Sequence, residues 1–99
     1  MIRGTTPTLE FVIPFDTSQL AEAFVTLSQN ESVVLDKALE ECSCNENKLS
    51  VKLTQEETLK LQCDCITEIQ IRARTIAGDA IASNIMRVNT GRILKEGVI

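Results

Sequence analysis

The stretch that decides the fold lies near the start of the sequence and reads Leu9-Glu10-Phe11-Val12-Ile13-Pro14-Phe15. Its apolar side chains at Leu9, Phe11, Ile13 and Phe15 occupy alternate positions, and side chains along a strand alternate between the two faces. The stretch therefore predicts a strand with one strongly apolar face, which belongs in the core of a β domain. Because this strand begins so close to Met1, we expect no targeting peptide ahead of it.

Length and composition indicate one small globular domain. The chain has 99 residues, of which 43% are hydrophobic and 24% are charged, as in ordinary folded proteins. We expect a single β-sandwich domain over residues 1–91 and a C-terminal tail over 92–99. The net charge of −4 argues against nucleic acid as a partner. No apolar run approaches the ~20 residues that span a bilayer, so we expect no membrane association, synthesis in the cytoplasm and reduced cysteines.

Further strand signals follow at regular spacing along the chain. Turn residues separate segments in which apolar and polar residues alternate, and these segments are 20–28, 32–39, 48–53, 66–75 and 80–88. Gln29-Asn30-Glu31 and Ala77-Gly78-Asp79 are expected to form the tight turns of two hairpins. Segments 20–28 and 80–88 also fit helical spacing, but the hairpin signals favour strands, with room for a bulge in the second. Six or seven short strands predict an all-β sandwich or small barrel.

Two other features concern the ends and connections of these strands. Pro7 and Pro14 flank the first strand, which is compatible with a strand at a sheet edge or one that switches sheets. Segment 40–47 is polar and is expected to be a connection that ends in a turn at Asn45-Glu46-Asn47.

The strand pattern is interrupted after Leu53. Thr54-Gln55-Glu56-Glu57 matches a capping box, in which the Thr54 side chain caps the first turn and Glu57 lies three residues later. The motif predicts one short helical turn near residues 54–61, with Leu59 or Leu61 folding under it.

Residues suited to catalysis are few. The chain contains no histidine, the commonest general base, and no Ser-x-x-Lys motif. The acid pairs Glu40-Glu41 and Glu56-Glu57 are expected to be solvated turn and cap residues. Arg72 and Arg74 lie on the same face of a predicted strand, and the simplest interpretation is that this face is exposed to solvent. We therefore expect a protein that is not an enzyme, with no catalytic, cofactor-binding or metal-binding residues and no cofactor.

Four cysteines in two pairs require a separate interpretation: Cys42, Cys44, Cys63 and Cys65. Four thiolates are the ligand number of a structural zinc site, but one intervening residue is fewer than the two to four of common zinc motifs. Disulfides Cys42–Cys65 or Cys44–Cys63 are a second interpretation, which a reducing compartment disfavours. Free thiols are the preferred interpretation.

Several motifs together resemble a known family. The opening Met1-Ile2-Arg3-Gly4-Thr5-Thr6-Pro7-Thr8, the corner Leu53–Leu59, Glu68–Arg72 and Gly78–Ser83 are similar, in order and spacing, to short proteins encoded in phages and prophages of Gram-positive (Firmicutes) bacteria. The opening and the Gln-Glu-Glu-Thr corner also resemble N-terminal β-sandwich modules of phage baseplate and tail proteins.

The resemblance implies an immunoglobulin-like β-sandwich of about seven strands. It also implies a structural or assembly component, associated with the tail or baseplate, that contacts other virion subunits or further copies of itself. Such a protein would be found in the cytoplasm when synthesised and afterwards in the virion. The alternative is a prophage-encoded regulatory or host-modulating binding protein that is not packaged.

Overall fold

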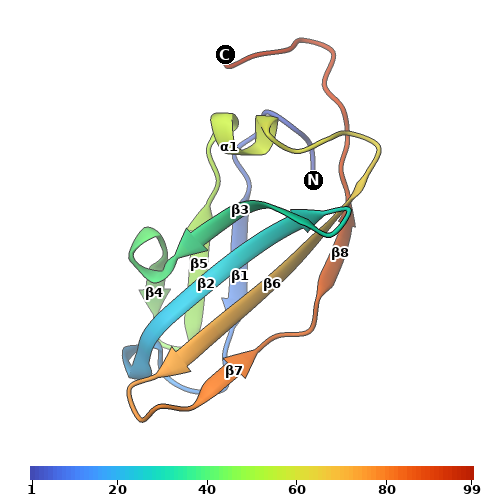
Figure 1. Ribbon diagram of the computed structural model, residues 1–99. Coiled ribbons are helices and arrows are strands. Elements are labelled where there is room, and N and C mark those ends of the chain that lie inside the picture. Colours follow the sequence, from blue (N-terminus) through green and yellow to red (C-terminus); the bar gives the residue numbers. More distant parts are fainter.

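Two antiparallel β-sheets enclose the core in the computed structural model, which describes residues 1–99 (Figure 1). One sheet has three strands in the order β1-β5-β4, and the other has five, in the order β3-β2-β6-β7, with β8 also paired to β6. The strands are β1 (Thr8–Val12), β2 (Leu20–Gln29), β3 (Ser32–Ala38), β4 (Ser43–Asn45), β5 (Lys48–Lys52), β6 (Ile66–Thr75), β7 (Ala80–Ala82) and β8 (Met86–Asn89). The all-β class predicted from the sequence is confirmed.

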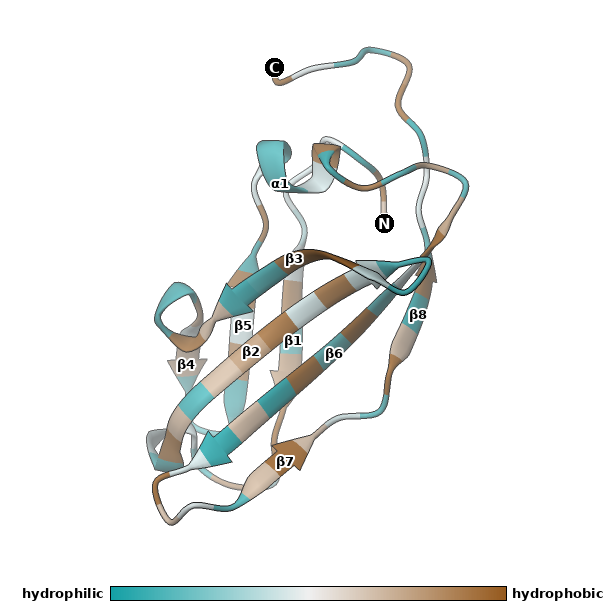
Figure 2. Ribbon diagram, viewed as in Figure 1, coloured by the Kyte–Doolittle hydropathy of each residue, from teal (hydrophilic) through white to brown (hydrophobic).

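The centre of the five-stranded sheet is the antiparallel pair β2 and β6, its two longest strands. Apolar and polar residues alternate along β6, as Figure 2 shows, and Val25 of β2 lies opposite Ile71 of β6. The inward side chains Ala23, Val25 and Leu27 are buried. The strand prediction for 20–28 is therefore confirmed, and the helical alternative is wrong.

Both predicted hairpin turns are confirmed. Asn30 and Glu31 have φ angles of 51° and 66°, and a two-residue turn of type I′ requires positive φ at both central residues. Gly78, between β6 and β7, has a φ of 96°, which glycine adopts without steric cost.

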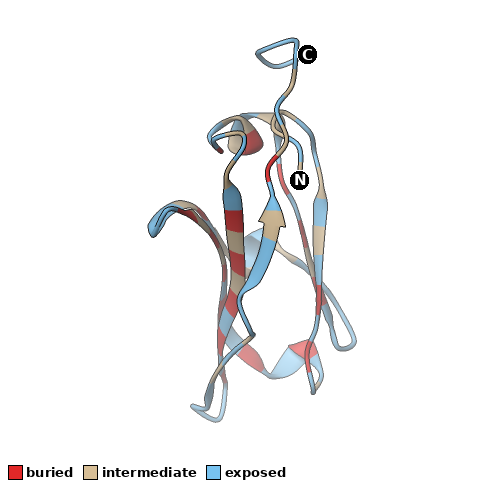
Figure 3. Cartoon of the chain, turned by 90° about the vertical axis from the view of Figure 1, so that its right-hand side faces the viewer, coloured by how far each residue is buried: buried red, intermediate tan, exposed pale blue.

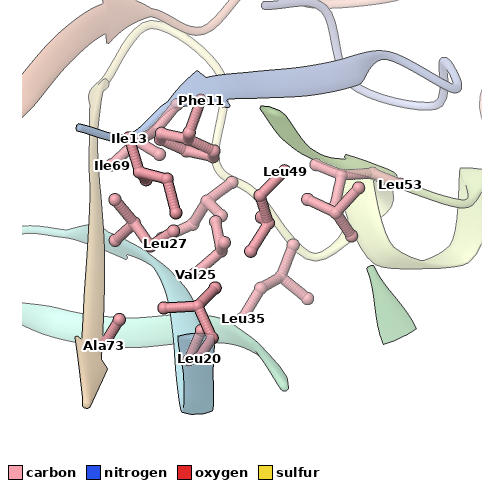
Figure 4. Close-up of a cluster of buried hydrophobic side chains, with 13 residues drawn as sticks. Phe11, Ile13, Leu20, Val25, Leu27, Leu35, Leu49, Leu53, Ile69 and Ala73 are labelled. Atoms are coloured by element: carbon pink, nitrogen blue, oxygen red, sulfur yellow. The ribbon is translucent and has the colours of Figure 1, made fainter. Parts of the chain in front are cut away.

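The hydrophobic core lies between the two sheets. In Figure 4, side chains of Phe11 and Leu49 from one sheet point toward those of Val25 and Leu27 from the other. Figure 3 views the molecule edge-on, with buried residues along both layers. The cluster consists of Phe11, Ile13, Leu20, Ala23, Val25, Leu27, Leu35, Leu49, Val51, Leu53, Ile69, Ile71 and Ala73.

The predicted helical turn is present as α1 (Gln55–Leu59). The Thr54 side chain accepts a hydrogen bond from the Glu57 N–H at 3.1 Å, and the Glu57 carboxylate accepts one from the Thr54 N–H at 2.9 Å. The capping box is thus confirmed, and Leu61, rather than Leu59, is the leucine that is fully buried beneath it. Two 3₁₀ turns, η1 (Thr17–Gln19) and η2 (Leu39–Glu41), complete the helical structure. No helix of the structure has the length and apolar character needed to cross a membrane.

Segment 40–47 differs from its prediction as a polar connection, because it contains η2 and the short strand β4. All three β4 side chains are exposed, so no apolar alternation marks the strand. Its backbone nevertheless pairs with β5, with Ser43 opposite Ser50. The turn at Glu46 and Asn47 lies where it was expected.

The single strand predicted over 80–88 is divided into β7 and β8. Arg72 of β6 lies opposite Ala82, whereas Ile69 lies opposite Met86, so the connection contains one residue more than a continuous ladder would need. Ser83 explains the break, because its side chain accepts a hydrogen bond from the Ile71 N–H at 3.1 Å. The first strand is also shorter than the prediction to Phe15: β1 ends at Val12.

A buried polar cluster closes one end of the core. Gln29 is the last inward residue of β2, and its side-chain NH₂ group donates one hydrogen bond to the Gln62 carbonyl at 2.9 Å. Its second proton is shared between Thr67 Oγ1 at 3.1 Å and Thr90 Oγ1 at 3.4 Å. Its side-chain oxygen accepts one from the Gln62 N–H at 2.8 Å. Gln29, Thr67 and Thr90 are all buried, so each needs these partners. The cluster joins β2, β6, the end of β8 and the loop after α1.

Replacing Gln29 with leucine should destabilise the protein. The Gln29→Leu change removes the hydrogen bonds to Gln62 and leaves the buried hydroxyls of Thr67 and Thr90 with only each other as partners, which lowers the free energy of unfolding by about 2–3 kcal/mol. Gln19→Leu is the matched control, because the Gln19 side chain is exposed and surface changes stay within about 0.5 kcal/mol. Urea unfolding of the two variants measures the difference, and equal effects would contradict the role given to Gln29.

Candidate functional site

An apolar groove of about 520 Å³ lies between the edge strand β1 and the edge formed by β7 and β8. Its volume falls in the range of ordinary ligand pockets. The groove reaches the core residues Phe11, Ile13, Leu20, Ile71 and Ala73. Its outer part is lined chiefly by Val12, Pro14, Ile81, Ala82, Ser83 and Met86, and its one ionisable residue is Glu10.

One wall of the groove is a free strand edge on β1. Residues that flank β1 and β5 form backbone hydrogen bonds with one another. The Ile13 N–H donates to the Asn47 carbonyl, and the Leu53 N–H donates to the Pro7 carbonyl, both at 2.9 Å. Hydrogen-bonded and non-bonded pairs alternate along an antiparallel ladder. The backbone N–H and C=O groups of Glu10 and Val12 therefore point away from β5, toward the groove. Pro7 and Pro14 were compatible with an edge strand or with a strand that switches sheets, and the structure has the first, since β1 pairs with β5 alone.

The opposite wall has a second free edge, on β7. Ser83 N–H donates to Ile71 O at 2.9 Å, and Thr75 N–H donates to Asp79 O at 2.8 Å. By the same alternation, the backbone groups of Ala80 and Ala82 point away from β6. The groove is thus flanked by unpaired backbone donors and acceptors on both sides.

The N-terminal residues close the gap between the sheets at the other end. Met1 donates from its amino group to Asn89 O at 2.8 Å, and its carbonyl accepts from the Gly91 N–H at 2.7 Å. Ile2 forms a parallel bridge with Gly91. The groove therefore remains open only along the part of β1 that faces β7 and the start of β8.

The residues singled out on the outer face of the five-stranded sheet form a smaller hollow of about 250 Å³. Arg72 lies directly opposite Phe24 in the ladder, and Arg74 contacts Glu22 at 3.4 Å. All four side chains are exposed. An exposed ion pair of this kind contributes little to stability, so the hollow is the weaker of the two candidates.

The four cysteines are free thiols in the structure: Cys42, Cys44, Cys63 and Cys65. Cys42 Sγ donates to Ala38 O at 3.4 Å, and burial raises the pKa of this thiol. A raised pKa reduces the thiolate population on which nucleophilic attack and metal binding depend. No group of three or more histidine, cysteine, aspartate or glutamate side chains lies close enough to hold a metal ion.

Two acids expected to be solvated, Glu41 and Glu57, converge on Lys37 of β3. Lys37 Nζ lies 2.6 Å from the Glu57 carboxylate and 3.4 Å from that of Glu41. The Lys37 side chain is only 11% exposed and that of Glu57 only 19%, so the solvated interpretation of Glu57 is wrong. Its role in the capping box is confirmed, whereas the ion pair between β3 and α1 was not predicted. The alternation of apolar and polar residues along a strand does not indicate which distant side chain will contact Lys37.

The ion pair shifts both pKa values in the direction that keeps the groups charged. The hydrogen bond to Glu57 raises the pKa of Lys37 against the opposing effect of burial. Burial acts to raise the pKa of Glu57, but hydrogen bonds from Lys37 and from the Thr54 N–H outweigh it and lower the pKa. The pair therefore stabilises the attachment of α1 to the five-stranded sheet at neutral pH.

The groove and its two free edges form the candidate site, because they combine an apolar surface with unpaired backbone groups. Such a surface suits binding of an extended polypeptide segment, which can supply both apolar side chains and backbone hydrogen bonds. Comparisons of the chain with protein-family models, with curated proteins and with solved structures gave no match.

The Glu57 ion pair should make stability depend on pH. Because the folded-state pKa of Glu57 is lowered, its contribution is present above the ordinary pKa of about 4.3 and is lost as the pH falls through the folded value. Glutamine at position 57 can still act in the capping box. The Glu57→Gln change should lower the free energy of unfolding by about 1 kcal/mol at pH 7. This difference between the variant and the unchanged protein should become smaller toward pH 3, where Glu57 itself becomes protonated.

The matched control is Glu56→Gln, which changes an exposed neighbour in the same helix and should have little effect at any pH. Urea unfolding at several pH values measures both. A Glu57→Gln effect that stays constant from neutral to acidic pH would contradict the ion pair.

Proposed function

We propose that this protein is a non-enzymatic structural or assembly module that acts through protein–protein contacts. The observation that supports the proposal is the apolar groove between two free strand edges, since β-strand addition to an open edge is a recurring mode of protein recognition. Glu10 is the one ionisable group that lines the groove, so the groove supplies no acid–base pair for a reaction.

We take the two sheets to be an immunoglobulin-like sandwich, in which the N-terminal segment contacts both layers. Met1 and Ile2 pair with the chain beyond β8, while the Pro7 carbonyl accepts from Leu53 after β5. A chain that joins both sheets in this way suits a sandwich of two packed antiparallel layers.

The place of action that we propose is a phage particle, in the tail or baseplate, after synthesis in the cytoplasm. The support is the resemblance carried by the opening residues and by the corner at Leu53–Leu59. These stretches contact one another: Thr58 Oγ1 donates to Thr5 O at 2.8 Å, and Arg3 donates to Leu59 O at 3.0 Å and to Leu61 O at 2.6 Å. The resemblance therefore concerns a single packed unit of the fold.

Fractionation of particles from an induced lysogen that encodes this chain tests the proposal. The protein should be recovered in purified virions or in assembly intermediates. Reproducible absence from both, together with co-purification of a host protein, would refute the structural role and favour the regulatory alternative.

Two neighbouring substitutions test whether the groove carries the contact. Met86 lines the groove and is 42% exposed, whereas Ile85 is 51% exposed and lines a hollow on the other face with Glu68 and Gln70. Met86→Glu places a charge in an apolar contact, so its recovery in particles should fall more than about tenfold. Ile85→Glu should be recovered like the unchanged protein, and equal recovery of the two variants would exclude the groove.

A further inference from the structure

The C-terminal tail presents apolar side chains that its own chain leaves uncovered. Leu94 is 92% exposed, Ile99 is 90% exposed and Val98 is 53% exposed. Residues 92–99 contain no helix or strand. Figure 1 shows this tail extending past α1, at the end of the molecule opposite β7. The chain thus carries an unfilled apolar groove and an uncovered apolar segment at opposite ends.

We propose that the groove binds the C-terminal tail, residues 92–99, of a second copy of this chain as an added strand. This inference rests on the proposed function and names the partner of the same site. The added strand would pair with the free backbone groups of β1 at Glu10 and Val12, or with those of β7 at Ala80 and Ala82.

The side-chain pattern of the tail suits such a strand. In an extended conformation Leu94 and Val98 share one face, and Ile93 and Ile99 share the other. A strand in either orientation therefore presents apolar side chains to the apolar groove. Residues 94–99 number six, which is an ordinary strand length.

The charges of the groove and of the tail also favour their binding to each other. Glu10 is the one ionisable residue of the groove. It lies 3.7 Å from Lys48 in an exposed ion pair, and Lys95 of an incoming tail would bring a second cation to the same carboxylate. Attraction between the Lys95 ammonium and the Glu10 carboxylate weakens as salt screens it.

The structure also explains why a neighbour, rather than the same chain, supplies the strand. Glu96 contacts Arg3 at 2.9 Å, and the backbone of Ile99 exchanges hydrogen bonds of 2.8 and 3.2 Å with the Gln55 side chain. These contacts hold the tail at the α1 end. They are exposed and therefore weak, so a tail can leave them for a neighbouring groove. The contact joins two different surfaces, and such head-to-tail contacts build rings or filaments.

Complementation between two variants is the decisive experiment. Met86→Glu disables the groove and leaves the tail intact, and the double variant Leu94→Lys/Val98→Lys disables the tail and leaves the groove intact. Sedimentation velocity should show oligomers of the unchanged chain that grow with concentration and shrink with added salt. Each variant alone should be monomeric, because its affinity for further copies of itself falls more than about tenfold. The mixture of the two variants should form a one-to-one dimer and nothing larger.

Controls keep each outcome interpretable. Ile85→Glu should oligomerise like the unchanged chain, and thermal unfolding should show that every variant remains folded. In a mixture of ¹³C-labelled and unlabelled chains, nuclear Overhauser contacts should join Met86 of one copy to Leu94 or Val98 of another. Monomers at all concentrations, contacts confined to one chain, or a mixture that stays monomeric would each overturn the inference.

Failure of this inference and failure of the proposed function give different results. A chain that stays monomeric in solution but is recovered in virions contradicts tail exchange and leaves the structural role intact. A chain that oligomerises through its tail but is absent from particles and assembly intermediates contradicts the structural role alone.

Discussion

The two sheets differ in width, and the other features of the candidate site depend on this mismatch. Three strands cannot cover the inner face of a sheet that is four strands wide, since β7 and β8 follow one another along the same edge of β6. The side of the core next to β7 and β8 therefore has no strand above it. The edges of β1 and β7 consequently keep unpaired backbone groups. Met1 and Ile2 close the gap only at the far end of β8, and the remaining opening is the groove.

Polar contacts between distant parts of the chain tie the structure together at the end of the molecule that contains α1. Gln29 joins β2 to β6 and to the end of β8, and Lys37 joins β3 to α1. Arg3 joins the N-terminus to the end of α1 through two backbone carbonyls. The groove walls themselves are held by backbone pairing of β1 with β5 and of β7 and β8 with β6, so the groove is a feature of the folded domain rather than of a loose terminus.

Local patterns explain which features the sequence predicted. The period-two alternation located β2, β5 and β6, the turn residues located both hairpins, and Thr54 with Glu57 located α1, because each depends on neighbouring residues alone. The strand β4 was missed because its side chains are all exposed. The Gln29 cluster, the Lys37 ion pair and the groove depend on the order of strands in the sheets, which alternation along one strand does not specify.

Hydrogen exchange along β1 tests most directly whether the groove is flanked by a free strand edge. Ile13 donates its backbone N–H to Asn47, and the alternation of the ladder assigns the same partner strand to Leu9 and Phe11. The account predicts slow exchange at Leu9, Phe11 and Ile13 and fast exchange at Glu10 and Val12 in the monomeric protein. Uniformly slow exchange at all five amides would show that the β1 edge is already occupied and would contradict it.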